Sequence, residues 1–161
     1  MAAGAASVAG NFTRRAKAQT PPPSAKLCHA CIGVGGMMGG VDLSNFISHP
    51  RLQIVALCDV DKNNLAVAAE KVPGARTYTD WRELLAKEGD AIDSVSVSTP
   101  DHMHAPITVS ALRARKHVYC QKPLCHDVAE AITMMRVAQN SGCVNHHGTQ
   151  YLYLVGDRLA V

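Results

Sequence analysis

Near its start the chain reads Ile32-Gly33-Val34-Gly35-Gly36-Met37-Met38-Gly39-Gly40. An apolar run from Leu27 to Ile32 precedes these glycines, and the residues after them fit a helix. A strand that enters such a turn and a helix that leaves it form a phosphate cradle, because glycines let backbone N–H groups approach an anion at the positive end of the helix. The pattern predicts a dinucleotide-binding loop, and a glycine-rich surface turn is the alternative.

An acidic residue stands where a dinucleotide site needs one. Asp59 ends the apolar run 54–58 and lies roughly 20 residues beyond the loop, where a carboxylate can accept hydrogen bonds from an adenosine ribose. Asp59 also favours NAD over NADP, because a carboxylate repels a ribose 2′-phosphate. Lys62 is close enough in sequence to soften this preference, so NADP remains the second cofactor considered.

Strand and helix patterns alternate along the rest of the chain. The expected strands cover residues 27–32, 53–59, 76–78, 94–99, 117–120 and 143–147. The expected helices run from the glycine loop to residue 49, from 62 to 72, from 80 onward, from 106 to 114 and from 128 to 141. This alternation predicts a Rossmann-type α/β fold, a doubly wound parallel sheet in a single domain, which binds ligands at the carboxyl ends of its strands.

Two of the expected helices carry specific features. Asp80 and Glu83 have the spacing of a capping box at a helix start. Apolar residues at helical spacing predict an amphipathic helix near the end of the chain; they are Val128, Ala131, Ile132 and Met135.

Composition limits the functional classes. The chain has 161 residues, 47% of them hydrophobic and 18% charged, which is typical of one soluble globular domain. The formal net charge of +3 is small, so a nucleic-acid-binding face has little support. Six cysteines allow a disulfide or metal interpretation, but most lie in expected strands, where they serve better as small apolar side chains.

Residues 1–25 are expected to be a disordered tail or part of an export signal. Met1 to Gly10 are small and apolar but too few to span a bilayer, so a membrane anchor is not expected. Arg14-Arg15 and Pro21-Pro22-Pro23 follow, as in the later part of a twin-arginine signal that begins upstream. A cytoplasmic protein with a plain tail and an exported protein remain equal alternatives.

Four ordered segments resemble the Gfo/Idh/MocA oxidoreductases, the family of glucose-fructose oxidoreductase and inositol dehydrogenase. They are Gly33-Val34-Gly35-Gly36-Met37, Ala56-Leu57-Cys58-Asp59, Ser98-Thr99-Pro100-Asp101-His102-Met103-His104 and Gln121-Lys122-Pro123-Leu124. The resemblance covers residues 26–150 and only the family's N-terminal NAD(P)-binding domain. Residues 151–161 form a C-terminal tail that does not look like the expected continuation.

The resemblance implies roles for individual residues. Thr99, Pro100 and His104 line the dinucleotide groove, and Lys122 stands beside the nicotinamide as the catalytic residue, where an ammonium can exchange protons with a substrate hydroxyl. An exposed lysine before a turn proline is the alternative for Lys122. The implied cofactor-binding residues are Gly33, Val34, Gly35, Gly36, Met37, Asp59, Thr99, Pro100, His104, Gln121 and Lys122.

The chain departs from the family pattern in three ways. The third loop glycine falls at Gly39 and not at Met38, so either the turn carries an extra residue or helix and strand pack less closely. Gln121 replaces a glutamate that could orient Lys122. The family's second domain, which carries the substrate pocket and the oligomer interface, is absent, so the chain as given is expected to bind a nicotinamide dinucleotide without turnover.

The expected function is that of the NAD(P)-binding domain of an oxidoreductase that acts on CH–OH groups of sugars or cyclitols. The alternative is a non-catalytic dinucleotide-binding module, or a truncated gene product, that associates with another chain. A methyltransferase using S-adenosylmethionine shares the glycine loop and the acid but not the Lys122-Pro123 loop. Four histidines near expected strand ends could be read as metal ligands, but no carboxylate or thiolate is placed to complete a site, so none is expected. These histidines are His102, His104, His146 and His147.

Overall fold

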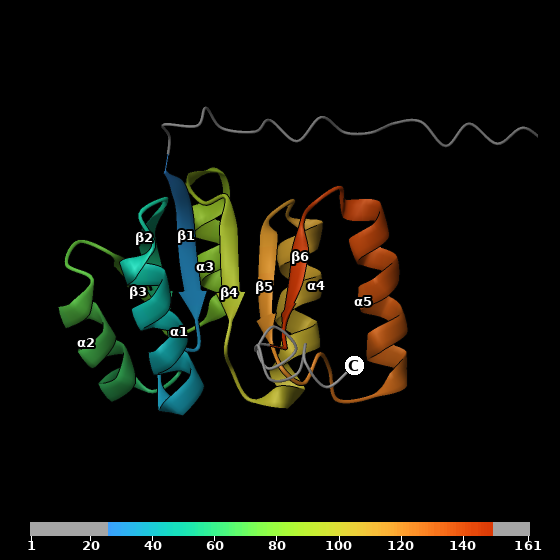
Figure 1. The fold of residues 1–161 in the computed structure, drawn as a ribbon, viewed down its shortest axis with the longest axis horizontal. Helices are drawn as coiled ribbons and strands as arrows, with labels where there is room; N and C mark the ends of the chain where they lie inside the picture. Colours follow the sequence, from blue (N-terminus) through green and yellow to red (C-terminus); the bar gives the residue numbers. More distant parts are fainter. Residues whose placement is uncertain (1–25, 150–161) are drawn as a thin grey trace, which may run out of the picture.

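The computed structural model describes residues 26–149, which form a six-stranded sheet with the order β3-β2-β1-β4-β5-β6. All neighbouring strands are parallel. The strands are β1 (Leu27–Ile32), β2 (Leu52–Cys58), β3 (Arg76–Tyr78), β4 (Ser94–Val97), β5 (His117–Gln121) and β6 (Asn145–Gly148). The order reverses between β1 and β4, so the chain winds outward from the centre in both directions (Figure 1). The predicted doubly wound parallel sheet is confirmed.

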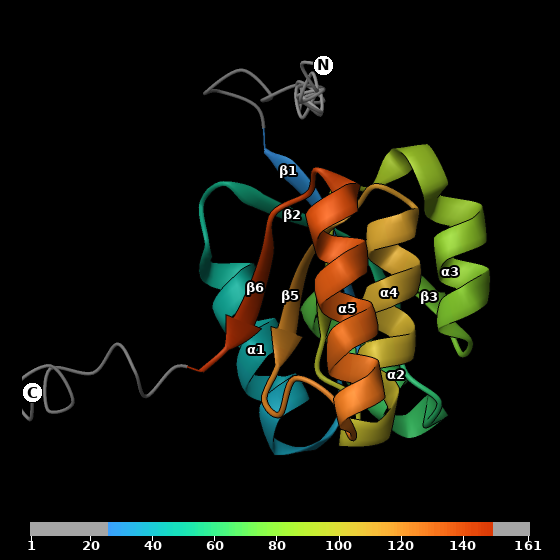
Figure 2. The ribbon, with the colours of Figure 1, turned by 90° about the vertical axis from the view of Figure 1, so that its right-hand side faces the viewer.

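Helices cover the sheet on both faces (Figure 2). They are α1 (Gly36–Ser48), α2 (Lys62–Lys71), α3 (Trp81–Glu88), α4 (His104–Arg113) and α5 (Val128–Ser141), with short 3-10 turns at Gly89–Ala91 and Asp101–Met103. Side chains alternate along β1, so Cys31 packs with Leu43 of α1 and Leu65 of α2, whereas Ile32 packs with residues of α3 and α4. The two apolar layers therefore lie on opposite faces of one sheet, as in α/β folds.

The strand ends differ slightly from expectation at the edge that carries the loops. β4 ends at Val97 and not at Thr99, because its partner β1 ends at Ile32, opposite Val97, where the chain enters the glycine turn. β5 continues one residue further than expected, because its pairing with β6 extends to Gln121 opposite Gly148. Gln121 therefore belongs to a strand, and its side chain is placed by the sheet.

The start of α3 is confirmed, but its capping box is wrong. The Asp80 side chain accepts a hydrogen bond from the backbone N–H of Arg82 and not of Glu83. The Glu83 carboxylate instead accepts from Lys87 Nζ at 2.6 Å, one turn further along the helix. The Asp80 cap alone satisfies one of the free N–H groups of the first turn.

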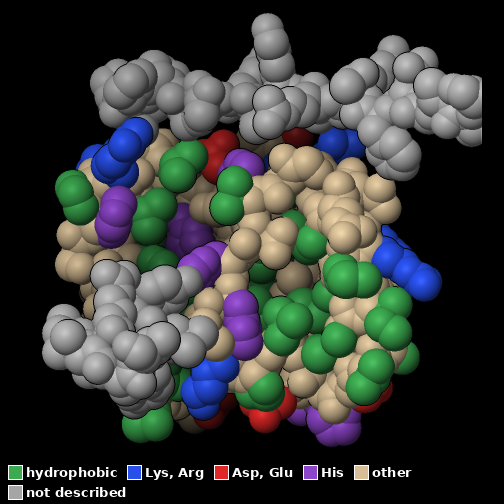
Figure 3. All heavy atoms as spheres, turned by 45° about the vertical axis from the view of Figure 1, so that its right-hand side comes forward, with side chains coloured by type: hydrophobic (Ala, Val, Ile, Leu, Met, Phe, Trp, Pro, Cys, Tyr) green, Lys and Arg blue, Asp and Glu red, His purple; other side chains and the backbone are tan. Residues whose placement is uncertain are grey.

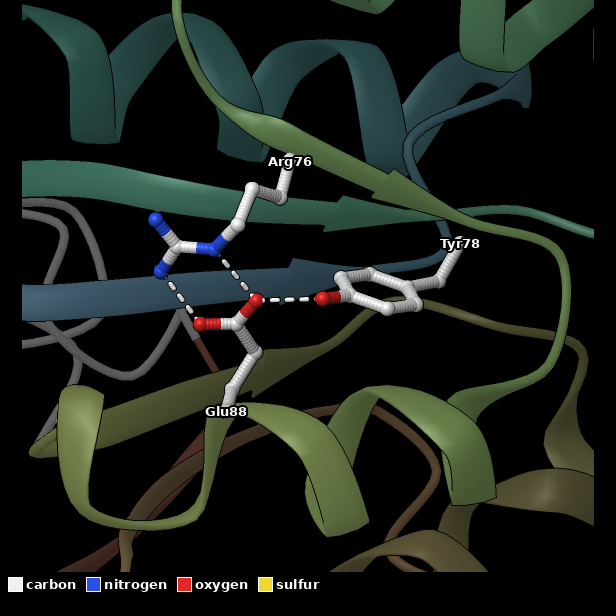
Figure 4. Close-up of polar contacts among 3 residues, drawn as sticks. All are labelled: Arg76, Tyr78 and Glu88. Atoms are coloured by element: carbon white, nitrogen blue, oxygen red, sulfur yellow. Dashed lines mark hydrogen bonds and ion pairs between the residues drawn. The ribbon is translucent and has the colours of Figure 1, made fainter.

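The edge strand β3 is held to α3 by a polar network (Figure 4). The buried carboxylate of Glu88 accepts hydrogen bonds from the Arg76 guanidinium and from the Tyr78 hydroxyl. Arg76 and Tyr78 are the first and last residues of β3, so one carboxylate holds the whole strand against the helix. This contact fixes the edge of the sheet next to the loop that follows β2.

α5 forms where expected, but its apolar face does not point entirely inward. Met134 is buried, whereas Val128, Ile132 and Met135 are exposed. The helix lies near the β6 edge and packs mainly on α4, so only a narrow stripe of it meets other residues (Figures 1 and 2). Figure 3 shows hydrophobic side chains at the surface of this part of the molecule.

None of the helices within residues 26–149 has the length and apolar character needed to cross a bilayer. The predicted tails, with the export-signal hypothesis, lie outside the described residues.

Candidate functional site

The loops singled out by the sequence lie at one edge of the sheet. β1, β2, β4 and β5 run parallel, so their carboxyl ends meet at the lower edge in Figure 1. The glycine turn follows β1, Asp59 follows β2, the Ser98–Pro100 loop follows β4, and Lys122 follows β5. This edge contains the point between β1 and β4 where the strand order reverses, which is where open α/β sheets bind ligands.

Two glycines let the turn and α1 pack tightly. Gly33 has φ +82°, and a Cβ there would lie 2.7 Å from backbone atoms of Ser98 and Thr99. A Cβ at Gly39 would lie 2.6 Å from the carbonyl oxygen of Gly33. Gly39 thus provides the close approach of helix to turn, although it stands one position later than the family pattern. This contact contradicts the looser packing of helix and strand that was one of the two alternatives.

The N-terminus of α1 has free hydrogen-bond donors. Its N-cap residue is Gly35, no side chain caps it, and its first turn contains no acidic residue. In contrast, α2, α3 and α5 are capped by the side chains of Asp61, Asp80 and Asp127. Backbone N–H groups at an uncapped helix start, together with the helix dipole, form an anion site. The residues present therefore fit a pyrophosphate at this turn.

Asp59 organises the glycine turn. Its Oδ2 accepts hydrogen bonds from the N–H of Val34 (3.0 Å) and of Gly35 (2.8 Å), and its Oδ1 accepts from the N–H of Asp61 (2.9 Å). A carboxylate has about four acceptor positions, so one position on Oδ1 remains for a ligand hydroxyl. The N–H groups of Val34 and Gly35 are used by Asp59, which leaves those at the start of α1 for phosphate.

A cavity of about 800 Å³ opens along this edge. Among its walls are seven of the predicted cofactor-binding residues, namely Gly33, Gly35, Gly36, Met37, Asp59, Thr99 and Pro100. The hydroxyl of Thr99 is buried and has no hydrogen-bond partner among the described residues. A buried hydroxyl without a partner is costly, and a bound ligand can satisfy it.

His104 does not line this cavity. Its side chain is 1% exposed, and its ring connects two loops. Nδ1 lies 2.5 Å from the carbonyl oxygen of Pro123, and Nε2 lies 2.8 Å from that of Thr99. Both partners are acceptors, so the ring nitrogen that carries a proton donates to one of these two carbonyl oxygens. His104 therefore fixes the Lys122 loop against the Thr99 loop.

Lys122 is exposed, and its backbone is held by the residue before it. Oε1 of Gln121 accepts a hydrogen bond from the N–H of Lys122 at 3.1 Å. Nε2 of Gln121 then faces the carboxylate of Asp42, at 2.9 Å from Oδ2 and 3.1 Å from Oδ1. The family pattern has a glutamate at position 121, and this chain has Gln121. Asp42 of α1 thus places a carboxylate within one hydrogen bond of that position.

Sequence reasoning missed four residues of this site. Asp42 is a buried acid in α1, and Ser98 donates to it. Trp81 and Arg82 line the cavity beyond Asp59, with the guanidinium 4.4 Å from the centre of the indole ring. An acid on the inner face of an otherwise apolar helix was the available signal for Asp42. Nothing local marks Trp81 and Arg82, because only the fold brings the start of α3 to the cavity.

The cysteines and histidines do not form a metal site within residues 26–149, where no three His, Cys, Asp or Glu side chains converge. All six cysteines are free thiols. Burial raises the pKa of Cys31 and of Cys58 to about 12 and that of Cys120 to about 11. These three are buried, as predicted for small apolar side chains, and their thiols stay protonated at neutral pH.

Comparison with known proteins gives a match to the sequence pattern of the Gfo/Idh/MocA group, described as an oxidoreductase family with an NAD-binding Rossmann fold, over residues 28–149. Inositol 2-dehydrogenase of Corynebacterium glutamicum is 32% identical over 110 residues, which are 67% of this chain and 32% of that protein. D-glucoside 3-dehydrogenase of Escherichia coli is 32% identical over 121 residues, 75% of this chain and 34% of that protein.

Solved structures agree with the fold. The crystal structure of myo-inositol 2-dehydrogenase from Lactobacillus plantarum superposes with a TM-score of 0.78 at 27% identity, over 84% of this chain and 40% of that one. GenD2 from gentamicin A biosynthesis, crystallised with NAD, gives a TM-score of 0.76 at 30% identity, over 88% of this chain and 40% of GenD2. The chain spans about a third of the length of the curated relatives it matches.

Proposed function

The chain belongs to the Gfo/Idh/MocA oxidoreductases, in their NAD-binding Rossmann domain, and from this premise we propose that the whole protein transfers a hydride between a CH–OH carbon of a cyclitol or sugar and nicotinamide. The observation that carries the proposal is the glycine turn at the switch point. Its Asp59 hydrogen bonds and its uncapped α1 start face a cavity of about 800 Å³. Unlike α2, α3 and α5, α1 begins without a capping side chain, and its N-cap residue Gly35 is bound by the strand-end acid Asp59.

The residues divide the binding of the dinucleotide between two halves of the sheet. On the β2 side, the free acceptor position of Asp59 Oδ1 binds the adenosine ribose, and the N-terminus of α1 binds the pyrophosphate. On the β4 side, Thr99 and Pro100 form the wall and the Thr99 hydroxyl donates to the ligand. Asp59 selects NAD over NADP, since its charge opposes a 2′-phosphate.

Lys122 is the residue for proton exchange. When bound at this cavity, NAD would supply the acceptor for the hydride of the carbinol carbon. The hydroxyl proton of the same carbinol leaves toward solvent through Lys122, and the product is a ketone. Gln121 and His104 act on the backbone of this loop and not on the substrate, so they are positioning residues.

The substrate class rests on the named relatives. The relatives that this chain matches include inositol 2-dehydrogenases and D-glucoside 3-dehydrogenase, whose substrates carry secondary hydroxyl groups on a six-membered ring. The match covers about a third of those proteins. The role proposed for residues 26–149 is therefore dinucleotide binding, and the reaction is proposed for the whole protein.

A second candidate is a non-catalytic dinucleotide-binding module that associates with another chain. The exposed apolar side chains of α5, together with Val144 before the β6 edge, favour an association surface (Figure 3). The oxidoreductase and the module share the cofactor site and differ in what the rest of the protein does.

Calorimetric titration of the purified chain with NAD, NADP and S-adenosylmethionine tests the proposal. Saturable binding of NAD, weaker binding of NADP and no competition by S-adenosylmethionine are expected. Reduction of NAD by myo-inositol or a D-glucoside after addition of a separate C-terminal polypeptide would support the oxidoreductase over the module. A folded chain that binds neither dinucleotide would contradict both.

A further inference from the structure

Asp42 is a buried carboxylate surrounded by neutral donors. It lies in α1 and is 5% exposed. Its Oδ2 accepts from Ser98 Oγ at 2.7 Å, and both of its oxygens accept from Nε2 of Gln121. The Gln121 amide has only one workable orientation, because its Oε1 is taken by the N–H of Lys122. The network therefore delivers N–H and O–H groups to Asp42 but no positive charge.

No cation pairs with Asp42 within the described part of the chain. The three ion pairs there join Arg76 with Glu88, Arg82 with Asp80 and Lys87 with Glu83. Burial without a counter-charge is unfavourable for a carboxylate, and it strengthens the field of the charge at neighbouring groups. Burial is the main cause of the raised pKa of Cys31 and of Tyr119, and the charge of Asp42 raises both further.

The position of Asp42 relative to the cavity gives this charge a role. Ser98, which donates to Asp42, lines the cavity, and Gln121 holds the backbone of Lys122. Ser98 follows β4 and Gln121 ends β5, so the two residues that bind the Asp42 carboxylate lie across the switch point from Asp59, which follows β2. A dinucleotide with its adenosine at Asp59 and its pyrophosphate at α1 would reach with its second nucleoside toward the end of β4, where Ser98, Thr99 and Pro100 line the cavity.

We propose that Asp42 is a fixed negative charge at the nicotinamide end of the groove, which makes the protein bind the oxidised, cationic ring more tightly than the reduced, neutral one. The inference rests on the proposed function. Asp42 of α1 would thus set the relative affinity for oxidised and reduced cofactor. Gln121 and Ser98 hold its carboxylate in place through their hydrogen bonds.

The size of the effect follows from one unit of charge. The two redox states of the ring differ by one positive charge. At a separation of about 10 Å and an effective dielectric constant of about 20, this difference corresponds to roughly a tenfold preference for the oxidised form. This preference is a ratio of two binding affinities, so it is measured without catalysis.

The test is calorimetric titration of the 161-residue chain with NAD and, separately, NADH. Wild type is expected to bind NAD more tightly than NADH. In Asp42→Asn the affinity for NAD is expected to fall roughly tenfold with little change for NADH. The matched control is Glu70→Gln, which removes an exposed acid of α2 outside the cavity, and its ratio of the two affinities should stay at the wild-type value.

A double variant moves the charge instead of removing it. Asp42→Asn with Gln121→Glu keeps one carboxylate in the network, shifted by one hydrogen bond, so it should restore most of the preference for NAD. Circular dichroism establishes that each variant is folded. If Asp42→Asn does not fold, the ratio of NAD affinity to NADH affinity in wild type and in the double variant tests the proposal instead.

The outcomes separate the inference from the proposed function. Folded wild type that binds neither NAD nor NADH would overturn the proposed function. Binding of both, with NADH tighter in wild type or with the same ratio in wild type and Asp42→Asn, would overturn the role of Asp42 and leave the NAD-binding domain standing.

Discussion

Oδ2 of Asp59 lies 2.8 Å from the backbone nitrogen of Gly35 and accepts its hydrogen. The acid at the end of β2 thus holds the turn at the end of β1 as well as facing the cavity. The same carboxylate builds the phosphate-binding turn and offers its last acceptor position to a ligand. A change at Asp59 is therefore expected to affect both the shape of the turn and the contact to a ribose.

Asp59→Ala is expected to lower the affinity for NAD by a factor of about ten or more, since it removes a charged hydrogen-bond acceptor and releases the N–H groups of Val34 and Gly35. Calorimetric titration with NAD measures the loss. Glu70→Ala is the matched control, because it removes an exposed acid of α2 outside the cavity. Equal affinities in wild type and Asp59→Ala would show that this acid has no part in binding.

Gly39→Ala is expected to destabilise the fold by about 1–3 kcal/mol, because its Cβ would meet the carbonyl oxygen of Gly33 at 2.6 Å. Gly40→Ala is the control on the same helix, since a Cβ there meets nothing within 4 Å. Alanine in a helix is favoured over glycine, so Gly40→Ala should stabilise by up to about 1 kcal/mol. Urea unfolding monitored by circular dichroism measures both. A neutral Gly39→Ala would mean that α1 does not pack closely on the turn.

Glu88→Gln is expected to destabilise the domain at neutral pH by weakening the contacts to Arg76 and Tyr78 (Figure 4). Hydrogen bonding from Arg76 holds the pKa of Glu88 below its ordinary value of 4.5. The carboxylate therefore contributes fully above about pH 4.5 and loses its contribution as pH falls through the lowered pKa.

The difference in unfolding free energy between wild type and Glu88→Gln should accordingly shrink on acidification below pH 4.5. Thermal unfolding across this range measures it, and Tyr78→Phe serves as the variant that removes one donor and keeps the charge. A difference that grows toward acid would contradict a stabilising role of the Glu88 carboxylate.

His104→Ala is expected to cost about 2 kcal/mol or more, because it removes a buried ring that lies within hydrogen-bond distance of the carbonyl oxygens of Thr99 and Pro123. The affinity for NAD should fall as well, since Thr99 lines the cavity. His126→Ala, a change of the same size at an exposed position after the Lys122 loop, should leave both quantities unchanged. Unfolding by urea and titration with NAD supply the two measurements.

Most of the fold could be predicted from the sequence, because the signals are local. β1 and β3 have the expected ends, and the glycine turn, Asp59 and Lys122 all follow strands that were expected. The outer face of α5 could not be predicted, since Val128, Ile132 and Met135 have the spacing of a buried face. How much of a helix is covered depends on its neighbours, and α5 lies near the edge of the sheet.

The sequence by itself determined the alternation of strands and helices, the phosphate-binding turn and the acid after β2, because each depends on residues close together in the chain. Only the tertiary structure decided that Gly39 takes the role of the third loop glycine, that His104 joins two loops instead of facing the cavity, and that Asp42 meets Gln121. The physical reason is distance along the chain. Asp42 and Gln121 are 79 residues apart, and only the folded chain brings the carboxylate of α1 to the amide at the end of β5.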